Sequence, residues 1–394
     1  MSAPTAMKPA APRFVLPVLA VGMFGAYLNY AVISPLLPAI SLDFGVTEAL
    51  AGQSATISLA VGFFVTLGLT PLVDRRPPRW WLILLASIMI ISAIVSAWAP
   101  TFAWFIVGRI LAGIGGSVLT ANVYAAAREA YADPLRRTRA LGVIASAASF
   151  AIIAGLPLIT LLGARFGWRY GMLAVAVPFL ILALGALAIP RPIGKPNPDP
   201  IGAIEAYRSV IFHREAMWLL LCFGAAMGAY NGWLVYFGAY AMASRGVSAD
   251  VLSIVFLISG VAELIFSNVA PRLSERYGLA AVAIGGLILN CLPLFLSMLV
   301  QGPVLLTVAA AVFSVGSILA YVALYARVLG VEHAQPGALL AMVSAATGLG
   351  SALGPLIAGW IILVSGSYDL AYVAMGVILL IGVVGYRQAD RAAA

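Results

Sequence analysis

Hydrophobic residues fill long runs along this chain, and short polar clusters, glycines or prolines separate one run from the next. Each run is about 20 residues long or longer, the length that an α-helix needs to cross the hydrocarbon core of a bilayer. The pattern predicts twelve membrane-spanning helices, over residues 14–40, 47–71, 79–98, 101–126, 139–164, 167–189, 215–243, 248–271, 278–299, 302–326, 336–364 and 368–386.

A single long polar segment, residues 190–214, lies between the sixth and seventh runs. It reads PRPIGKPNPDPIGAIEAYRSVIFHR, and its five prolines between residues 190 and 200 prevent a continuous helix there. The chain therefore divides into two sets of six helices. We predict an N-terminal six-helix bundle over residues 1–189, a cytoplasmic linker over 190–214 and a C-terminal six-helix bundle over 215–394.

The composition excludes the other broad classes of protein. Of the 394 residues, 63% are hydrophobic and 9% are charged, and the mean hydropathy is +1.06. An average soluble protein has about 25% charged residues. A soluble globular enzyme, a secreted disulfide scaffold and a disordered chain are therefore ruled out. Cys222 and Cys291 lie in separate apolar runs without a CxxC or histidine neighbour, so we expect no disulfide and no metal site.

The positive charges predict how the helices are oriented. If the N-terminus is cytoplasmic, eighteen of the 22 lysines and arginines fall in cytoplasmic segments, and Arg165, Arg169 and Arg245 fall outside. Cytoplasmic loops of membrane proteins carry just such an excess of positive residues. We therefore predict a multi-pass protein of the cytoplasmic (inner) membrane with both termini in the cytoplasm. The lipid bilayer explains the net charge of +8, and we expect no nucleic-acid partner.

An internal repeat relates the two sets of helices. Leu-Val-Asp-Arg at residues 72–75 matches Leu-Ser-Glu-Arg at residues 273–276, and Gly-Leu-Pro at residues 155–157 matches Gly-Pro at residues 354–355. The two offsets are 201 and about 198 residues. Two matches at nearly one offset, in corresponding helices, indicate two parallel six-helix repeats.

The acid–arginine pairs of this repeat lie at the cytoplasmic ends of the second and eighth predicted helices. A carboxylate there is able to pair with nearby arginines or with the N-terminus of a helix from the other half. We expect both pairs to act in gating rather than in solute binding: Asp74 and Arg75 in the first half, and Glu275 and Arg276 in the second.

Three motifs resemble those of the major facilitator superfamily. Residues 70–79, TPLVDRRPPR, resemble the family's loop motif G-x-L-a-D-R-x-G-R-K, with Pro77 in place of the second glycine. An arginine before a glycine-rich face stands at residues 109–116, and GLPL with a later FGWR stands at residues 155–169. The resemblance covers essentially the whole chain. It implies an all-α polytopic membrane protein of twelve transmembrane helices in two six-helix repeats, similar to the exporters of drugs, sugars or nucleosides.

The resemblance also implies a central cavity lined by helices 1, 4, 7 and 10, and each of these predicted helices carries polar or small residues near its middle. Buried amides need partners inside a bilayer, and a cavity with water or solute provides them. Aromatic stripes also serve simple packing, so both interpretations stay open. The candidate cavity residues are Asn29, Tyr30, Arg109, Gly113, Tyr230, Asn231, Trp233, Ser317 and Tyr321.

Arg109 and Glu263 are the two charged residues deep inside predicted spans. Arg109 either binds a carboxylate or phosphate of the solute or pairs with polar groups of the first helix. A charge at the depth of Glu263 costs roughly 2.5–3.5 kcal/mol on insertion scales. Because desolvation favours a protonated carboxyl, Glu263 is either a proton carrier or a hydrogen-bonded structural residue.

These features predict a secondary active transporter that moves a small organic solute by alternating access, as a proton-coupled exporter (an antiporter for efflux). The alternative is a proton-independent facilitator or importer of a small metabolite. An anionic or zwitterionic solute would suit Arg109. No HExxH, GxSxG or Walker motif is present, so we expect no enzyme activity and no cofactor. We expect the protein to work as a monomer, with protons as its coupling ion.

Overall fold

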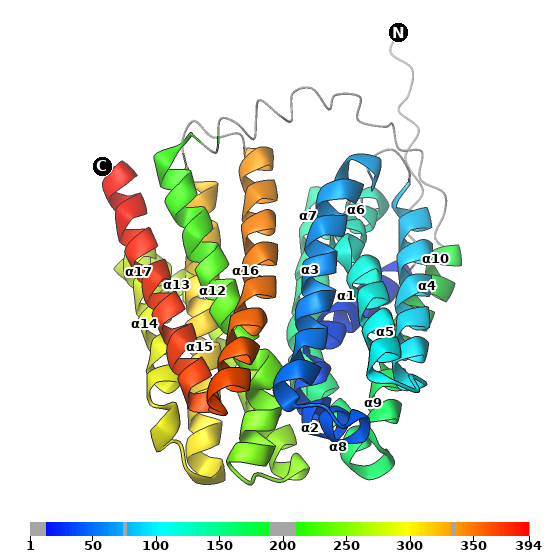
Figure 1. Ribbon diagram of the computed structural model, residues 1–394. Helices are drawn as coiled ribbons and strands as arrows, with labels where there is room; N and C mark the ends of the chain where they lie inside the picture. The colour runs from blue at the N-terminus through cyan, green and yellow to red at the C-terminus, as the bar shows by residue number, and fades with distance from the viewer. Residues whose placement is uncertain are drawn as a thin grey trace.

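The computed structural model describes residues 13–73, 77–131, 133–188, 210, 212–331 and 336–393, and the regular elements of these residues are helices. They form two upright groups that stand side by side (Figure 1). The first group contains α1 (Val15–Ala31), α2 (Ile33–Phe44), α3 (Glu48–Val73), α4 (Pro78–Ala97), α5 (Phe102–Ser117), α6 (Leu119–Ala130), α7 (Pro134–Phe150), a π-helical turn (Ala151–Gly155), α8 (Leu156–Phe166), α9 (Trp168–Ala174) and α10 (Ala176–Ala188). We call this group the N half.

The second group, the C half, runs from residue 214 to the end of the described chain. It contains α12 (Arg214–Ala239), a π-helical turn (Tyr240–Ser244), α13 (Ala249–Tyr277), α14 (Leu279–Phe295), a short 3-10 turn (Ser297–Leu299), α15 (Gly302–Leu329), α16 (Pro336–Ser365) and α17 (Tyr368–Ala393). The domain boundaries predicted at residues 189 and 214 border a segment that lies mostly outside the described residues.

The twelve predicted spans agree with the described helices. Ten helices or continuous helix stretches are long and apolar enough to cross a membrane, the bent pair α1 and α2 makes an eleventh, and the shorter apolar helix α14 completes the set. The predicted and observed ends differ by at most seven residues, and the largest difference is at the end of α17. The helices extend beyond the apolar runs because their last turns lie outside the hydrocarbon core, where polar residues are tolerated.

Prolines explain three of the helix irregularities. A proline has no N–H group to donate to the carbonyl four residues earlier. Pro35 therefore frees the carbonyl of Ala31, at the 47° bend between α1 and α2. Pro157 follows the π-helical turn that interrupts the fifth span, and Pro178 follows the break between α9 and α10. The three breaks let these spans curve around their neighbours without leaving the bilayer.

Glycines bring α12 and α16 into backbone contact at the side of the C half that faces the N half. A Cβ atom at Gly350 would overlap the carbonyl of Gly224, and one at Gly354 would overlap the carbonyl of Gly228. In a bilayer there is no hydrophobic drive between helices, so small residues that permit close packing supply the attraction. These two glycine pairs hold α16 where it meets α3 of the N half.

Candidate functional site

The two halves meet mainly along three pairs of helices: α3 with α16, α8 with α13, and α2 with α12. Smaller contacts join α13 to α7 and to the π-helical turn at residues 151–155, and α12 to α3. Hydrogen bonds across this seam gather near one end. The amide nitrogen of Gln53 donates to the carbonyl of Pro355 and to the hydroxyl of Tyr236, at 3.3 Å each. The hydroxyl of Tyr236 in turn donates to the carbonyl of Ala49, at 3.1 Å. These bonds join the first turns of α3 to α12 and α16.

Two more contacts strengthen the same end of the seam. The backbone N–H of Gly238 donates to the hydroxyl of Ser34, at 3.1 Å. The hydroxyl of Tyr368, the first residue of α17, is hydrogen-bonded to the carboxylate of Glu48, in the first turn of α3. This end is opposite the one at which the chain's C-terminus lies (Figure 1). We call it the closed end, and it consists of Ser34, Glu48, Gln53, Tyr236, Gly238 and Tyr368.

Tyrosines from both halves face a common space nearer the middle of the molecule. Tyr27 and Tyr30 of α1 are 41% and 40% exposed. Exposure at mid-span would also fit a lipid-facing position. However, Tyr27 lies within electrostatic range of Tyr325 and Glu263, which belong to the C half. The exposed side of Tyr27 therefore faces the region between the halves, which we call the central space.

The C half contributes the opposite wall of the central space. Tyr230 of α12 lies within electrostatic range of Glu263 and Tyr27, and Tyr321 of α15 lies within range of Tyr27 and of Tyr124 in the N half. The rings of Tyr321 and Tyr325 lie 4.7 Å apart, centroid to centroid. Tyrosines combine a flat apolar ring with a polar hydroxyl. The walls therefore suit a planar solute that also makes hydrogen bonds.

Glu263 presents a carboxyl group to the central space. Its side chain is partly buried on α13, and its Oε2 atom is buried without a hydrogen-bond partner among the described residues. Tyr27 of the N half and Tyr230 of the C half both lie within electrostatic range of this carboxyl. A buried charge without a partner is costly. A proton-coupling role for Glu263 stays a prediction at this point.

Arg109 lies instead inside the N half. Its side chain is 2% exposed; Nη1 donates to Oδ1 of Asn29 at 3.3 Å, and Nη2 donates to the hydroxyl of Ser58 at 3.5 Å. Asn29 is itself buried, and a Cβ at Gly113 would overlap the backbone of Ser58. The contact with Asn29 matches the alternative that Arg109 pairs with polar groups of the first helix, and a role of these three residues in solute binding stays a prediction. In this conformation Arg109, Asn29 and Gly113 join α5 to α1 and α3.

The other predicted cavity residues divide between packing and the central space. Trp233 is buried, and its ring lies on Phe313 of α15 with the centroids 4.1 Å apart. Trp233 therefore packs between Phe237 and Phe313 in this conformation, and its role in the cavity stays a prediction. The amide nitrogen of Asn231 donates to the hydroxyl of Ser351 on α16 at 3.1 Å, and Ser317 contacts Asn290 of α14.

Of the nine candidates, Tyr230 and Tyr321 therefore lie beside the central space, Tyr30 lies next to Tyr27, and a role in solute binding stays a prediction for all nine. Sequence reasoning did not include Tyr27, Tyr124 or Tyr325 among them. Their spacing carried a signal, because Tyr27 precedes Tyr30 by three residues and Tyr325 follows Tyr321 by four, so that each pair shares a helix face.

The gating residues are only partly described. Asp74 and Arg75 lie outside the described residues. Glu275 and Arg276 are exposed in the last turn of α13, and the guanidinium of Arg276 lies 5.2 Å from the centre of the Tyr277 ring. A gating role for the four residues stays a prediction.

Comparisons with known proteins agree on one family. The model of the Major Facilitator Superfamily matches residues 19–331 and 237–393. The transporter YbcL of Bacillus subtilis, described as an uncharacterised MFS-type transporter, is 26% identical over 286 residues, which are 72% of each chain. The purine ribonucleoside efflux pump NepI of Escherichia coli K12 is 25% identical over 264 residues, 67% of this chain and 65% of the pump. The match therefore spans about two thirds of the pump's length.

Two solved structures share the fold. The nucleoside transporter NupG superposes with a TM-score of 0.79 at 15% identity, over 95% of this chain and 99% of that one. A bacterial homologue of the human lysosomal transporter Spinster, in an inward-facing and unoccupied conformation, has a TM-score of 0.77 at 16% identity, over 96% and 97%. At these identities the likeness is one of fold.

Proposed function

This chain belongs to the major facilitator superfamily of membrane transporters, and we propose that it exports a small organic solute in exchange for protons. The observation that carries the proposal is the position of Glu263. Its carboxyl has an oxygen without a hydrogen-bond partner in the described part of the chain and faces a space that both halves line with tyrosines. A carboxyl in that position is able to bind a proton when the central space opens to one side and to release it when the space opens to the other.

The chemistry of the central space favours a nucleoside or a similar planar solute. Aromatic rings stack on tyrosine faces, and the ribose and base offer groups for the tyrosine hydroxyls. The names of two similar proteins, a purine ribonucleoside efflux pump and a nucleoside transporter, support the same choice. Arg109 already donates to Asn29 and Ser58, so the solute needs no anionic group.

The predicted orientation of the termini assigns a conformation to this structure. With both termini on the cytoplasmic side of a bacterial inner membrane, the closed end is the outer end. This conformation is then inward-facing. Similarity to an inward-facing Spinster homologue supports that assignment. Because one chain supplies both walls of the central space, a monomer is sufficient for transport. A solute entering from the cytoplasm would leave once the hydrogen bonds of the closed end break and the inner end closes.

The test is transport of tritiated adenosine into proteoliposomes that contain the purified protein. An antiporter accumulates its solute on the acidic side of the membrane, whichever way the protein is inserted. We therefore expect adenosine to accumulate in vesicles with an acidic lumen, and a protonophore to abolish the accumulation. Equilibration that ignores the pH gradient would favour the facilitator, and accumulation in vesicles with an alkaline lumen would favour a proton-coupled importer.

A further inference from the structure

A small pocket beside the central space contains a polar group that plays no part in the transport mechanism proposed above for Glu263 and the tyrosines. It lies between α12, α14 and α15, and its walls include Phe223, Tyr230, Asn290, Ser317 and Tyr321. The volume open to the centre of a water molecule is about 10 Å³, which is room for about one water or one amino group. Tyr230 and Tyr321 also line the central space, so the pocket adjoins the proposed solute path.

The hydrogen bonds of the pocket determine which atom of Asn290 is free. The amide nitrogen of Asn290 donates to the hydroxyl of Ser317 at 2.7 Å, and that hydroxyl donates to the carbonyl of Phe313 at 2.9 Å. A serine hydroxyl has one hydrogen. Because Phe313 receives it, Ser317 accepts from Asn290, and the amide must present its nitrogen to Ser317. Its oxygen, Oδ1, is then left as a hydrogen-bond acceptor.

This acceptor has no donor within the described protein. Asn290 is 2% exposed, and its Oδ1 atom is buried without a hydrogen-bond partner. An unsatisfied buried acceptor destabilises a protein. A ligand that brings a donor to Oδ1 therefore gains a hydrogen bond that the protein alone does not make.

We propose that Asn290 and Ser317 form an acceptor subsite of the solute cavity, which receives an amino group carried on a planar aromatic ring. The proposal rests on the proposed export of nucleosides and adds a rule for choosing among them. The rings of Tyr230 and Tyr321 border the pocket and supply faces for the aromatic ring. The pocket itself has room for the amino group and for little more. Adenosine, with its exocyclic amino group, fits this description, and purine riboside, which lacks that group, does not.

The experiment compares the dissociation constants of adenosine and purine riboside for the purified full-length protein, by isothermal titration calorimetry. The variants are Asn290→Leu and Ser317→Ala. The matched control is Asn122→Leu, because Asn122 of α6 is also fully buried with an unpartnered Oδ1 but is not among the residues that line this pocket. Wild type and Asn122→Leu should bind adenosine about 10-fold more tightly than purine riboside, the effect of one hydrogen bond to a buried acceptor.

Asn290→Leu should reduce this preference to about 2-fold or less and leave purine riboside affinity within about 2-fold of wild type. Ser317→Ala should reduce the preference as well, because the amide of Asn290 is then free to turn its nitrogen toward the ligand. If Asn290→Leu does not fold, Ser317→Ala decides the question alone. A 10-fold preference that survives in the folded variants overturns the subsite but leaves nucleoside export intact. If wild type binds neither compound, both the subsite and the nucleoside assignment are wrong.

Discussion

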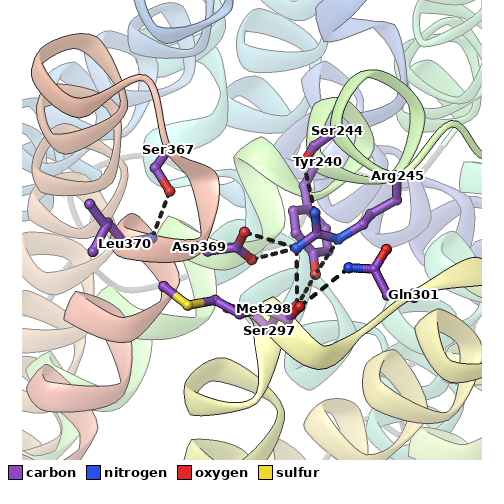
Figure 2. Close-up of polar contacts among 9 residues, drawn as sticks. All are labelled: Tyr240, Ser244, Arg245, Ser297, Met298, Gln301, Ser367, Asp369 and Leu370. Atoms are coloured by element: carbon purple, nitrogen blue, oxygen red, sulfur yellow. Dashed lines mark hydrogen bonds and ion pairs between the residues drawn. The ribbon is translucent and has the colours of Figure 1, made fainter.

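Arg245 donates hydrogen bonds from one guanidinium nitrogen to both carboxylate oxygens of Asp369, at 2.7 and 2.8 Å (Figure 2). The same nitrogen donates to the carbonyl of Ser297 at 3.1 Å, and the guanidinium lies 4.7 Å from the centre of the Tyr240 ring. The cluster joins the end of the first helix of the C half to the start of its last helix.

The N half contains an equivalent pair with the charges exchanged. Asp43, at the end of α2, pairs with Arg169, in α9, at 2.5 Å. Asp43 precedes Arg245 by 202 residues, and Arg169 precedes Asp369 by 200, which matches the offset of the internal repeat. The repeat thus preserves the pairing of its first and sixth helices but not which helix supplies the acid.

Removal of Asp369 should be more costly than removal of Asp43. The side chains of Arg245 and Asp369 are 10% and 18% exposed, whereas those of Arg169 and Asp43 are 41% and 39% exposed. Asp369→Asn leaves a poorly solvated cation and should lower the free energy of unfolding by about 2–4 kcal/mol. Asp43→Asn, as the matched control, should lower it by about 1 kcal/mol or less. Tryptophan-fluorescence melting in one detergent measures both, and equal losses would contradict the prediction.

The stabilisation by Arg245 should not change between pH 6 and pH 9. Burial alone would lower the pKa of Arg245, but its hydrogen bonds with Asp369 and Tyr240 raise it above the ordinary arginine value. A raised pKa stabilises the folded state at every pH below the unfolded pKa, and the contribution is lost only as pH rises through the folded value. The melting-temperature difference between wild type and Asp369→Asn should therefore stay constant across this range. A difference that shrinks toward pH 9 would show that the guanidinium loses its proton there.

Glu263→Gln should abolish accumulation driven by a pH gradient. The amide imitates the protonated carboxyl and cannot release a proton, while the central space and the rocking of the halves remain. Exchange of labelled for unlabelled adenosine at equal pH should therefore continue, and Glu263→Asp should retain part of the coupling. Asp250→Asn, an exposed acid in the first turn of the same helix, is the matched control and should behave as wild type. Full gradient-driven accumulation by Glu263→Gln would remove this residue from the mechanism.

Arg109 and Asn29 should be coupled in stability rather than in solute affinity. The single variants Arg109→Ala and Asn29→Ala and the double variant define a double-mutant cycle. A hydrogen bond from a buried guanidinium should give a coupling energy of about 1.5–3 kcal/mol in unfolding measurements. Adenosine affinity should change by about 3-fold or less in the folded variants, because neither side chain lies on the wall of the central space. If Arg109→Ala loses more free energy of adenosine binding than free energy of unfolding, Arg109 takes part in solute binding and the prediction is wrong.

Gly238→Ala should weaken the closed end. A Cβ atom at Gly238 would overlap the carbonyl of Ser34, so α12 and α2 would have to separate. The outward-open population should rise, because the substitution destabilises one conformation more than the other. Ala49→Cys, in a background without Cys222 and Cys291, reports this opening through labelling by a membrane-impermeant maleimide, because Ala49 is 4% exposed and contributes only its backbone carbonyl to the closed end. Gly285→Ala is the control, since a Cβ there meets no atom within 4 Å. Equal labelling rates in the two variants would contradict the prediction.

The sequence by itself determined the twelve spans, because the bilayer imposes a length and a polarity that are visible residue by residue. It underestimated α7, α13 and α17, whose ends carry charged residues that remain helical outside the hydrocarbon core. The sequence also identified Glu263 as the one acidic residue that lies deep inside a predicted span. Tyr30, Tyr230 and Tyr321 were accessible to the same reasoning, since a polar hydroxyl at mid-span needs a partner or a cavity.

Only the tertiary structure decided which of these mid-span residues contact a neighbouring helix and which face the central space. Arg109 and Trp233 satisfy the same mid-span criterion as Tyr230, yet one donates to Asn29 and the other stacks on Phe313. Asn290 lies on a helix outside the expected cavity wall, and its free oxygen depends on the hydroxyl of Ser317. Helical periodicity assigns each residue to a face of its own helix. It does not say which helix packs against that face, because that choice depends on the shapes of surfaces far apart in the chain.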